Sequence, residues 1–438
     1  MRKSDVYESR RNKEERVTGM RRAGLLAVLG VASAFMAAAC GGGDSGGGDS
    51  GGGGGGESVK VVSDLPLQGA NRAQTTTMVN SIKLALEERD GKVGDLKVEY
   101  ESLDDATAQL GQWDEAKCAE NAQDAASNDD VVGWIGPFNS GCAAVQIPIL
   151  NKAGLPMVSP ANTYIGLTKP GGESDEPDKY YPSGERNYSR VIVADDKQGA
   201  AGAALMEEEG LESVYILDDR ETYGKGLADQ FEKAAEKAGI EIVGREGIDG
   251  SASNYRSLMN KIKQADPDAI YFGGIIENNA AQILKDKVGA GMPNDEVAFI
   301  GPDGIFVDSL IEQAGDASDG IFVTFGGLPE SELSDKGKEF VKNYESKYDD
   351  DIQPYTAYAY EAANVMFDAI ERAAEEAGGV PDRAAVLEQL YATEDFDGVL
   401  GTWSFDEDGD TSLTELSVQK VEGGKFKLDR VLDVKDLV

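Results

Sequence analysis

The chain of 438 residues contains no histidine, which limits the chemistry its side chains can do. A Ser-His-Asp triad, a Cys-His pair and an HExxH zinc helix are all excluded. Acid–base chemistry would have to use Asp, Glu, Lys or Tyr. The pattern GxSxG occurs only around Ser45 and Ser50, inside a glycine-rich run. A nucleophile elbow needs a strand-to-helix turn there. We therefore expect no enzyme, no cofactor and no metal site.

One acid-rich stretch, Asp406-Glu-Asp-Gly-Asp, loosely resembles a calcium loop. Its spacing fails the EF-hand pattern, in which glycine stands at the sixth position and glutamate closes the loop at the twelfth. We expect a hairpin turn at this place.

The formal net charge of −38 excludes whole classes of partner. A nucleic acid backbone requires a basic surface, and so does docking on anionic lipids. The hydrophobic share of 40% and the charged share of 28% are ordinary for a globular protein. The length suits two or three domains of usual size.

The N-terminus has the features of a secretory signal over residues 1–39. Arg21 and Arg22 precede an apolar run over 23–36, and three alanines lead to Cys40. The run is shorter than the ~20 residues of a membrane span, which is the alternative. The segment resembles the lipobox of bacterial lipoproteins, with Ala37 where leucine is usual. That resemblance implies a diacylated Cys40. We hypothesise that translation starts at Met20.

A glycine-rich run over 41–56 follows Cys40, and we interpret residues 40–57 as a lipidated cysteine with a flexible linker. Once Cys40 is lipidated, Cys118 and Cys142 remain as a pair. An exported protein sits where disulfides persist, so a disulfide between these two is favoured. Two free buried thiols are the alternative.

From Val59 onward, strand and helix patterns alternate, which predicts an α/β fold with parallel sheets. The rhythm restarts at Val191-Ile-Val, which reads as a strand before a helix over about 197–209. Between the halves, 170–186 reads as a long loop. Helices are predicted over about 334–348 and 355–376, and a strand-rich tail begins near Gly398. Two α/β halves predict a ligand in the cleft between them.

Seven segments in this order are similar to one family: Asp64-Leu-Pro-Leu-Gln-Gly, Val132-Gly-Trp-Ile-Gly-Pro-Phe-Asn-Ser, Met157-Val-Ser-Pro-Ala-Asn-Thr, Asp218-Asp-Arg-Glu-Thr-Tyr-Gly-Lys-Gly, Tyr271-Phe-Gly-Gly, Gly301-Pro-Asp-Gly and Trp403-Ser-Phe-Asp-Glu-Asp-Gly-Asp. From about Val59 to about Lys427 the chain resembles the substrate-binding lipoproteins of leucine/isoleucine/valine-type ABC transporters.

The resemblance implies the type I periplasmic-binding-protein fold. In that fold two doubly wound, Rossmann-like lobes are joined by three hinge crossings. We expect lobe I to comprise 58–193 plus 326–398, and lobe II 194–325 plus 399–438. Relatives also carry a disulfide close to the positions of Cys118 and Cys142.

The resemblance also implies a ligand site for an amino acid. Ser140, Ala161 and Thr163 match the contacts to the α-carboxylate, Tyr223 the tyrosine that covers the ligand, and Asp303 the acid that faces the ammonium. Each has a plain structural alternative: Ser140 and Asp303 as helix caps, Thr163 as a turn residue, Tyr223 as core. We add the further pocket residues Gln74, Asn139, Ile275 and Glu277. The resemblance implies a branched-chain-like or related amino acid, or an amide, as the ligand. Gln74, Ile275, Glu277 and the short acid Asp303 depart from the family pattern, which favours a polar or extended amino acid or an amide over leucine.

The resulting hypothesis is a monomeric solute receptor outside the cytoplasm, anchored to the cell membrane by lipid. It would pass its ligand to the permease and ATPase subunits of an ABC importer, without nucleic acid as a partner. Two alternatives remain: a sensor domain of the same fold that signals to a membrane partner, and a secreted enzyme with an Asp/Glu pair.

Overall fold

The computed structural model describes residues 57–435. The expectations for the signal peptide, the start at Met20, the lipidated Cys40 and most of the linker lie outside this range. Among the helices of 57–435, none combines the length and apolar character that a membrane crossing requires.

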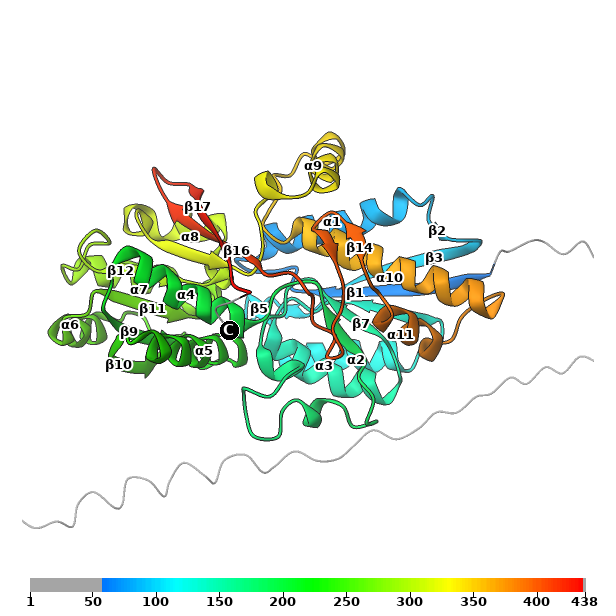
Figure 1. Cartoon of the computed structure of the whole chain (residues 1–438), viewed down its shortest axis with the longest axis horizontal. Coiled ribbons are helices and arrows are strands. Elements are labelled where there is room, and N and C mark those ends of the chain that lie inside the picture. Colours follow the sequence, from blue (N-terminus) through cyan, green and yellow to red (C-terminus); the bar gives the residue numbers. More distant parts are fainter. Residues whose placement is uncertain (1–56, 436–438) are drawn as a thin grey trace, which may run out of the picture. The chain divides into compact units, whose positions relative to one another are not determined.

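The first half of the chain forms a six-stranded sheet, which we call the sheet of the first lobe (Figure 1). At its centre, β1 pairs in parallel with both β3 and β6, and its apolar run is buried, as expected for a strand covered on both faces. The strand order is β2-β3-β1-β6-β7-β8. The bounds are β1 Ser58–Leu65, β2 Lys92–Val93, β3 Leu96–Asp104, β6 Val131–Ile135, β7 Met157–Ser159 and β8 Tyr188–Arg190.

Helices from both ends of the described chain pack on this sheet. Asp114 caps the start of α2 by accepting hydrogen bonds from Ala116 N and Lys117 N, as its position before the helix predicts. The late helix α10 contacts α1 and β6, and it lies among the blue and cyan elements in Figure 1. The helices are α1 Arg72–Glu87, α2 Glu115–Ala126, α3 Ser140–Lys152, α10 Thr356–Ala377 and α11 Arg383–Tyr391.

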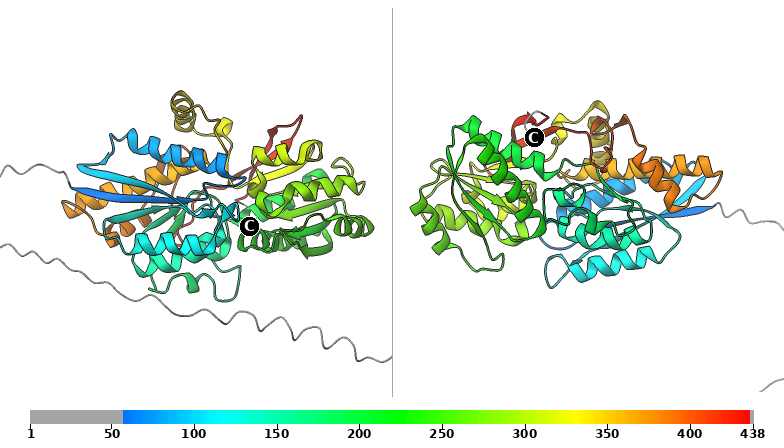
Figure 2. Two further views of the ribbon diagram at one scale, coloured as in Figure 1. Left: turned by 180° about the vertical axis from the view of Figure 1, so that it is seen from behind. Right: turned by 60° about the horizontal axis from the view of Figure 1, so that its bottom comes forward.

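The second half forms a seven-stranded sheet, the sheet of the second lobe. Its order is β10-β9-β11-β12-β13-β16-β17, parallel up to β13 and then antiparallel. The last two strands therefore stay with the second lobe, as the views in Figure 2 show. The strands are β9 Ser213–Asp218, β10 Glu241–Gly247, β11 Ala269–Gly273, β12 Ala298–Gly301, β13 Phe322–Phe325, β16 Glu415–Val421 and β17 Phe426–Asp433.

Five helices accompany the second sheet, and α5 contacts β9, β10 and β11. Two of the helices, α4 and α5, end at Gly210 and Gly239 in the left-handed conformation, which glycine adopts without strain. The helices are α4 Asp195–Glu209, α5 Thr222–Ala238, α6 Arg256–Ala265, α7 Ala280–Gly289 and α8 Asp308–Ala314. A further helix, α9, spans Asp335–Lys347, with Ser334 as its cap.

The chain passes between the two sheets three times, and the crossing segments lie next to one another. Val193 N donates to Gly326 O at 3.4 Å, and Arg190 N donates to Gly409 O at 3.0 Å. The prediction of a strand at Val191–Val193 is wrong, because the strand β8 ends at Arg190. Residues 191–193 are apolar because the first crossing is buried, not because they belong to a sheet.

Two short hairpins complete the fold, β4 Ala106–Thr107 with β5 Gln112–Trp113, and β14 Phe396–Gly398 with β15 Gly401–Trp403. The second hairpin packs on α10 of the first lobe, where Trp403 Nε1 donates to Glu361 Oε1 at 2.7 Å.

The acid-rich stretch 406–410 forms the expected hairpin turn. Asp406 Oδ1 accepts hydrogen bonds from the backbone N–H of Asp408 and of Asp410, at 3.0 and 2.9 Å. Its carboxylates form ion pairs with basic side chains of the first lobe, namely Lys169, Arg186 and Arg190. The turn thus ties the tail of the chain to the first lobe.

Candidate functional site

The first predicted site residues lie where β6 ends and α3 begins. Asn139 is the residue before the helix and Ser140 its first residue, and both are buried. Ser140 Oγ accepts a hydrogen bond from Tyr164 N at 3.3 Å, while Asn139 Oδ1 has no partner. The first backbone N–H groups of a helix have no partner within the helix, so this position can receive a carboxylate.

The next two predicted site residues, Ala161 and Thr163, lie in a buried turn after β7. Ser159 Oγ accepts hydrogen bonds from Ala161 N at 3.1 Å and from Asn162 N at 2.9 Å. The Ala161 N–H therefore already has a partner within the turn. The Thr163 hydroxyl is buried and lacks a hydrogen bond of normal geometry. Of the two residues, Thr163 thus has the group that a ligand could use.

The side chain of Arg190 stabilises the backbone of this turn. Its guanidinium donates to Tyr164 O at 2.9 Å and to Asn162 O at 3.3 Å, and also to Thr168 Oγ1. Its Nε donates to Asp410 Oδ1 at 2.7 Å. A buried arginine with its donors used in this way holds the backbone of the turn in a fixed shape.

On the second lobe, Asp303 lies in a short 3-10 turn over Asp303–Ile305 that follows β12. Its Oδ1 accepts hydrogen bonds from Gln198 Nε2 at 2.6 Å and from the Tyr223 hydroxyl at 2.7 Å, and its Oδ2 accepts one from the Tyr355 hydroxyl. Burial raises the pKa of the Asp303 carboxyl, and these three hydrogen bonds act against that rise. Asp303 therefore does not serve as a helix cap.

Asp195, which the sequence reasoning missed, is the first residue of α4. Its side chain is 0% exposed, and neither carboxylate oxygen has a hydrogen-bond partner of normal geometry. Its backbone N–H donates to Thr163 O at 2.9 Å, which places it against the turn of the first lobe. Burial and the charge of Asp303 raise its pKa well above the ordinary value, while the nearby Thr163 hydroxyl and the charge of Arg190 act against that rise.

A direct contact joins the two lobes near the start of α1. Glu277 accepts hydrogen bonds from Asn71 N and from Asn71 Nδ2, each at 3.0 Å. Burial raises the pKa of the Glu277 carboxyl to about 7, against the effect of these bonds. Next to it, Ile275 is buried and its N–H donates to Asp219 Oδ2 at 3.2 Å. Gln74 follows on α1, 1% exposed, with both amide atoms unpartnered.

The structure brings the predicted residues Tyr223 and Asp303 into direct contact, and it places Thr163 against Asp195 at the start of α4. Tyr355, which bonds to Asp303, also packs against Phe138, whose ring lies 5.3 Å from its own. Gln198 and Tyr355 were missed together with Asp195. The sequence signal for Asp195 and Gln198 was their three-residue spacing at a helix start, which places both side chains on one face.

Several buried polar atoms of the predicted site residues and of the start of α4 lack a hydrogen bond of normal geometry. A buried polar atom without a hydrogen bond costs folding free energy, and native proteins tolerate few. Here they come from both lobes. They are Gln74 Oε1 and Nε2, Asn139 Oδ1, Thr163 Oγ1, both oxygens of Asp195, and Gln198 Oε1.

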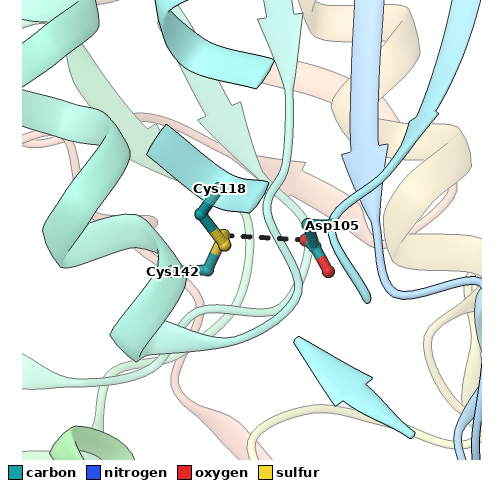
Figure 3. A group of neighbouring side chains, drawn as sticks. All are labelled: Asp105, Cys118 and Cys142. Carbon is teal, nitrogen blue, oxygen red and sulfur yellow. Dashed lines mark hydrogen bonds between the residues drawn. A yellow bond between two sulfur atoms is a disulfide. The ribbon is translucent and has the colours of Figure 1, made fainter. Parts of the chain in front are cut away.

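The pair of cysteines lies elsewhere in the first lobe (Figure 3). Cys118 and Cys142 form a disulfide with a Cα–Cα distance of 5.7 Å, joining α2 to α3. Asp105 Oδ2 lies 3.7 Å from Cys142 Sγ. Within 57–435 these three residues are the one group with the geometry to hold a metal ion. Sulfurs bonded to each other are not thiolate ligands, so the group does not fit a metal.

Comparison with known proteins gives a consistent picture. The family model described as "Periplasmic binding protein" matches residues 58–425. A Leu/Ile/Val-binding protein homolog 2 of Brucella abortus is 30% identical over 307 residues, covering 68% of this chain and 75% of that protein.

Solved structures agree with the fold. A leucine-binding protein of Thermotoga maritima is 27% identical with a TM-score of 0.74, covering 86% of this chain and 99% of that one. A solute-binding protein of R. palustris in complex with 4-hydroxybenzoate has a TM-score of 0.71 at 19% identity, covering 86% of this chain and 97% of that one. At 19% identity, this structural similarity supports a shared fold and nothing further.

Proposed function

Since the chain belongs to the periplasmic binding protein family, we propose that it binds an amino acid between its two lobes and delivers it to an ABC importer. Members of this family are receptors and not enzymes, and the chain is a receptor of the same kind. The preferred ligand is a branched-chain-like or related amino acid, or an amide.

In this proposal the first lobe binds the α-carboxylate. The start of α3 and the Ser140 hydroxyl lie beside the turn that carries Thr163, through the bond from Tyr164 N to Ser140 Oγ. Backbone N–H groups at a helix start and a hydroxyl are a suitable set of donors for an anion. Because Arg190 holds the turn, these donors are in place before the ligand arrives.

The second lobe binds the ammonium through Asp303. The observation that carries the amino acid assignment is the burial of this carboxyl between Gln198, Tyr223 and Tyr355, at the junction of the two lobes. A buried carboxyl is costly unless it has a charged or strongly donating partner. An ammonium group supplies such a partner.

Closure of the lobes then shields the ligand from water. Three kinds of interlobe contact support a closed arrangement: the bonds from Asn71 to Glu277, the bond from Ser309 Oγ to Ala70 O at 3.3 Å, and close packing of Tyr164 against α5. A Cβ atom added to Gly226 would clash with the Tyr164 ring, so glycine is required there for the lobes to approach.

We keep the proposed division into lobes, with one change. The first lobe takes 58–193 and the second 194–325, as expected from the sequence. The hairpin β14–β15 packs on α10 and Trp403 bonds to Glu361, so we propose that the third crossing follows Trp403 instead of falling at 398–399.

We further propose that a lipid on Cys40 and the glycine-rich linker hold this monomeric receptor outside the cytoplasm, close to the permease. One acyl chain anchors a protein only weakly, whereas two anchor it stably, which suits a diacylated cysteine. The short apolar run before Cys40 supports this proposal.

A thermal-shift screen of the purified full-length protein tests the function. We expect one or more of the common amino acids or their amides to stabilise it, by about 2.7 kcal/mol at a hundredfold excess over Kd. 4-Hydroxybenzoate serves as the contrasting ligand. If it raises the melting temperature and no amino acid or amide does, the proposed ligand class is wrong.

A further inference from the structure

We propose that the loop over 170–186 of the first lobe latches onto α5 of the second lobe, and that Glu176 is the positioning residue that keeps it there. We call this loop, together with the Tyr164 side chain that it holds, the latch. The inference rests on the proposed function and goes beyond it, because it concerns how slowly a bound ligand leaves.

The carboxylate of Glu176, whose side chain is 2% exposed, holds the latch together. One oxygen accepts hydrogen bonds from the Tyr164 hydroxyl at 2.6 Å and from Glu173 N at 2.7 Å. The other accepts one from the Tyr180 hydroxyl at 2.6 Å and pairs with Lys179 Nζ at 3.0 Å. Burial acts to raise the pKa of this carboxyl, but the hydrogen bonds outweigh burial and bring the pKa below its ordinary value. Because a carboxylate has about four acceptor positions, Glu176 is fully engaged within the first lobe.

Tyr164 extends this cluster to the second lobe. Its ring is buried and lies against Gly226 of α5, where a Cβ atom would clash with it. Within the loop, a Cβ atom on Gly172 would clash with the Tyr164 hydroxyl and with the Glu176 carboxylate. The ring therefore fills the space between the loop and the helix, and its bond to Glu176 fixes its orientation there.

A second contact lies further along α5. Gly171 O accepts hydrogen bonds from Gln230 Nε2 and from Lys233 Nζ, each at 3.0 Å. Gly171 has a φ of +147°, which glycine adopts readily and other residues rarely do. Residues 226, 230 and 233 are four and three positions apart, so they share one face of the helix. The latch thus follows this face over about two turns.

The helix that the latch contacts also carries Tyr223 of the candidate site. Tyr223 stands three positions before Gly226, and its hydroxyl donates to Asp303 Oδ1 at 2.7 Å. In the proposed function, the second lobe moves away from the first when the ligand leaves. The latch contacts must then break, because their two sides belong to different lobes. They therefore slow reopening, whereas the first encounter of a ligand with the open form does not involve them.

The test measures association and dissociation rates on the full-length protein by stopped-flow tryptophan fluorescence. The probes are the twenty common amino acids and their amides. Gln230→Ala/Lys233→Ala removes both hydrogen bonds to Gly171 O from the side of the helix. We expect the dissociation rate to rise about fivefold or more, and the association rate to change by less than about twofold. An unchanged dissociation rate overturns the latch.

Glu176→Gln tests the positioning role. The amide keeps the shape of the side chain, but its NH2 group cannot accept the hydrogen bonds that one carboxylate oxygen accepts. We expect dissociation to be faster by a similar factor. Combining this change with Gln230→Ala/Lys233→Ala should give no faster dissociation than the faster of the two variants, because both act through the same contact. Effects that multiply in the combined variant overturn the positioning role.

Glu173→Gln is the matched control. This side chain belongs to the same loop, is 75% exposed and pairs with Lys179 at 3.1 Å, so the change should leave both rates as they are. A purely structural role for Glu176 would lower the melting temperature of the unliganded variant without changing the dissociation rate, which overturns the inference. If Glu176→Gln does not fold, Tyr164→Phe replaces it, since it removes one of the same bonds and keeps the ring. An unchanged dissociation rate in folded Tyr164→Phe has the same meaning.

Failure of the proposed function is distinguishable. A wild-type protein that binds no amino acid and no amide overturns the function and this inference with it. A wild-type protein that binds one of them, with a dissociation rate that Gln230→Ala/Lys233→Ala leaves unchanged, overturns this inference alone.

Discussion

The Tyr355 hydroxyl donates a hydrogen bond to the Asp303 carboxylate, and these two residues belong to different lobes. Tyr355 directly precedes α10, which packs on the first sheet, whereas Asp303 follows β12 of the second sheet. The Tyr355 ring also packs edge-on against Phe138 and Phe325, at 5.3 and 5.2 Å between ring centroids. The bond therefore connects the lobes at the site itself.

Replacing Tyr355 by phenylalanine removes this bond and keeps the ring. Hydrogen bonds to charged groups contribute about 1.5–3 kcal/mol, so we expect ligand affinity to fall about tenfold or more, mainly through faster dissociation. Stopped-flow fluorescence would measure both rates. Tyr348→Phe is the control, since the Tyr348 hydroxyl donates to Asn80 O at 3.1 Å and that bond does not reach the ligand site. Equal rates for the wild type and Tyr355→Phe would contradict the prediction.

Because of Glu277, we expect the free energy of closing the two lobes to depend on pH. Burial raises its pKa to about 7, from an ordinary value of 4.5. When the lobes part, the carboxyl returns to water and to its ordinary pKa, so closing takes up a proton between these values. Closure is therefore favoured below pH 7 and loses this contribution as pH rises through 7. Ligand affinity should weaken by about thirtyfold between pH 5.5 and 8.5 on this account.

Glu277→Gln tests that dependence directly. The oxygen of the introduced amide can accept from Asn71 N, and its NH2 group can donate to Asn71 Oδ1, which lacks a partner in the wild type. The variant should retain affinity at low pH and show a flatter pH profile than the wild type. The same slope in both proteins would assign the pH dependence to other groups.

The disulfide between Cys118 and Cys142 should stabilise the first lobe. With a sequence separation of 24, loop entropy predicts a contribution of about 3 kcal/mol to the free energy of unfolding. The double variant Cys118→Ala/Cys142→Ala should unfold at lower denaturant concentration. A reducing agent should shift the wild type toward the variant and leave the variant unchanged. Coincident unfolding curves without reductant would refute the prediction.

The variant Cys40→Ser, expressed in cells that export the protein, tests whether a lipid is attached at Cys40. The unmodified receptor should leave the membrane fraction and appear in the soluble exported fraction, because the lipid is its proposed anchor. Detergent phase partitioning and mass spectrometry of the N-terminal peptide would measure this. Retention of the variant on the membrane would indicate a spanning segment instead.

Much of the fold could be predicted from local patterns. Apolar runs such as that of β1 depend on nearby residues, and the helices expected over about 334–348 and 355–376 match α9 and α10. The first crossing was misread as a strand, because a buried apolar run looks the same in both situations. That error moved the expected start of α4 to residue 197 and hid Asp195.

The short motif Gly-Pro-Asp-Gly was enough to select Asp303 as a candidate site residue, and the structure buries it. Its partners Gln198 and Tyr355 are separated from it by 105 and 52 residues, and only the tertiary fold brings them together. Arg190 and Asp410 are 220 residues apart. Their pairing follows from how the tail returns to the first lobe, which no local pattern encodes.

The pairing of Arg190 with Asp410 has a consequence for the order of events in binding. Arg190 belongs to the first lobe and Asp410 to the third crossing, and neither takes part in the second sheet, so we expect the pair to hold the turn with Thr163 in an open form as well. In the proposed function, the part of the site that binds the ligand carboxylate would therefore keep its shape before the lobes close. We then expect substitutions in that turn to change the association rate of the ligand, and substitutions in the contacts made by the second lobe to change its dissociation rate.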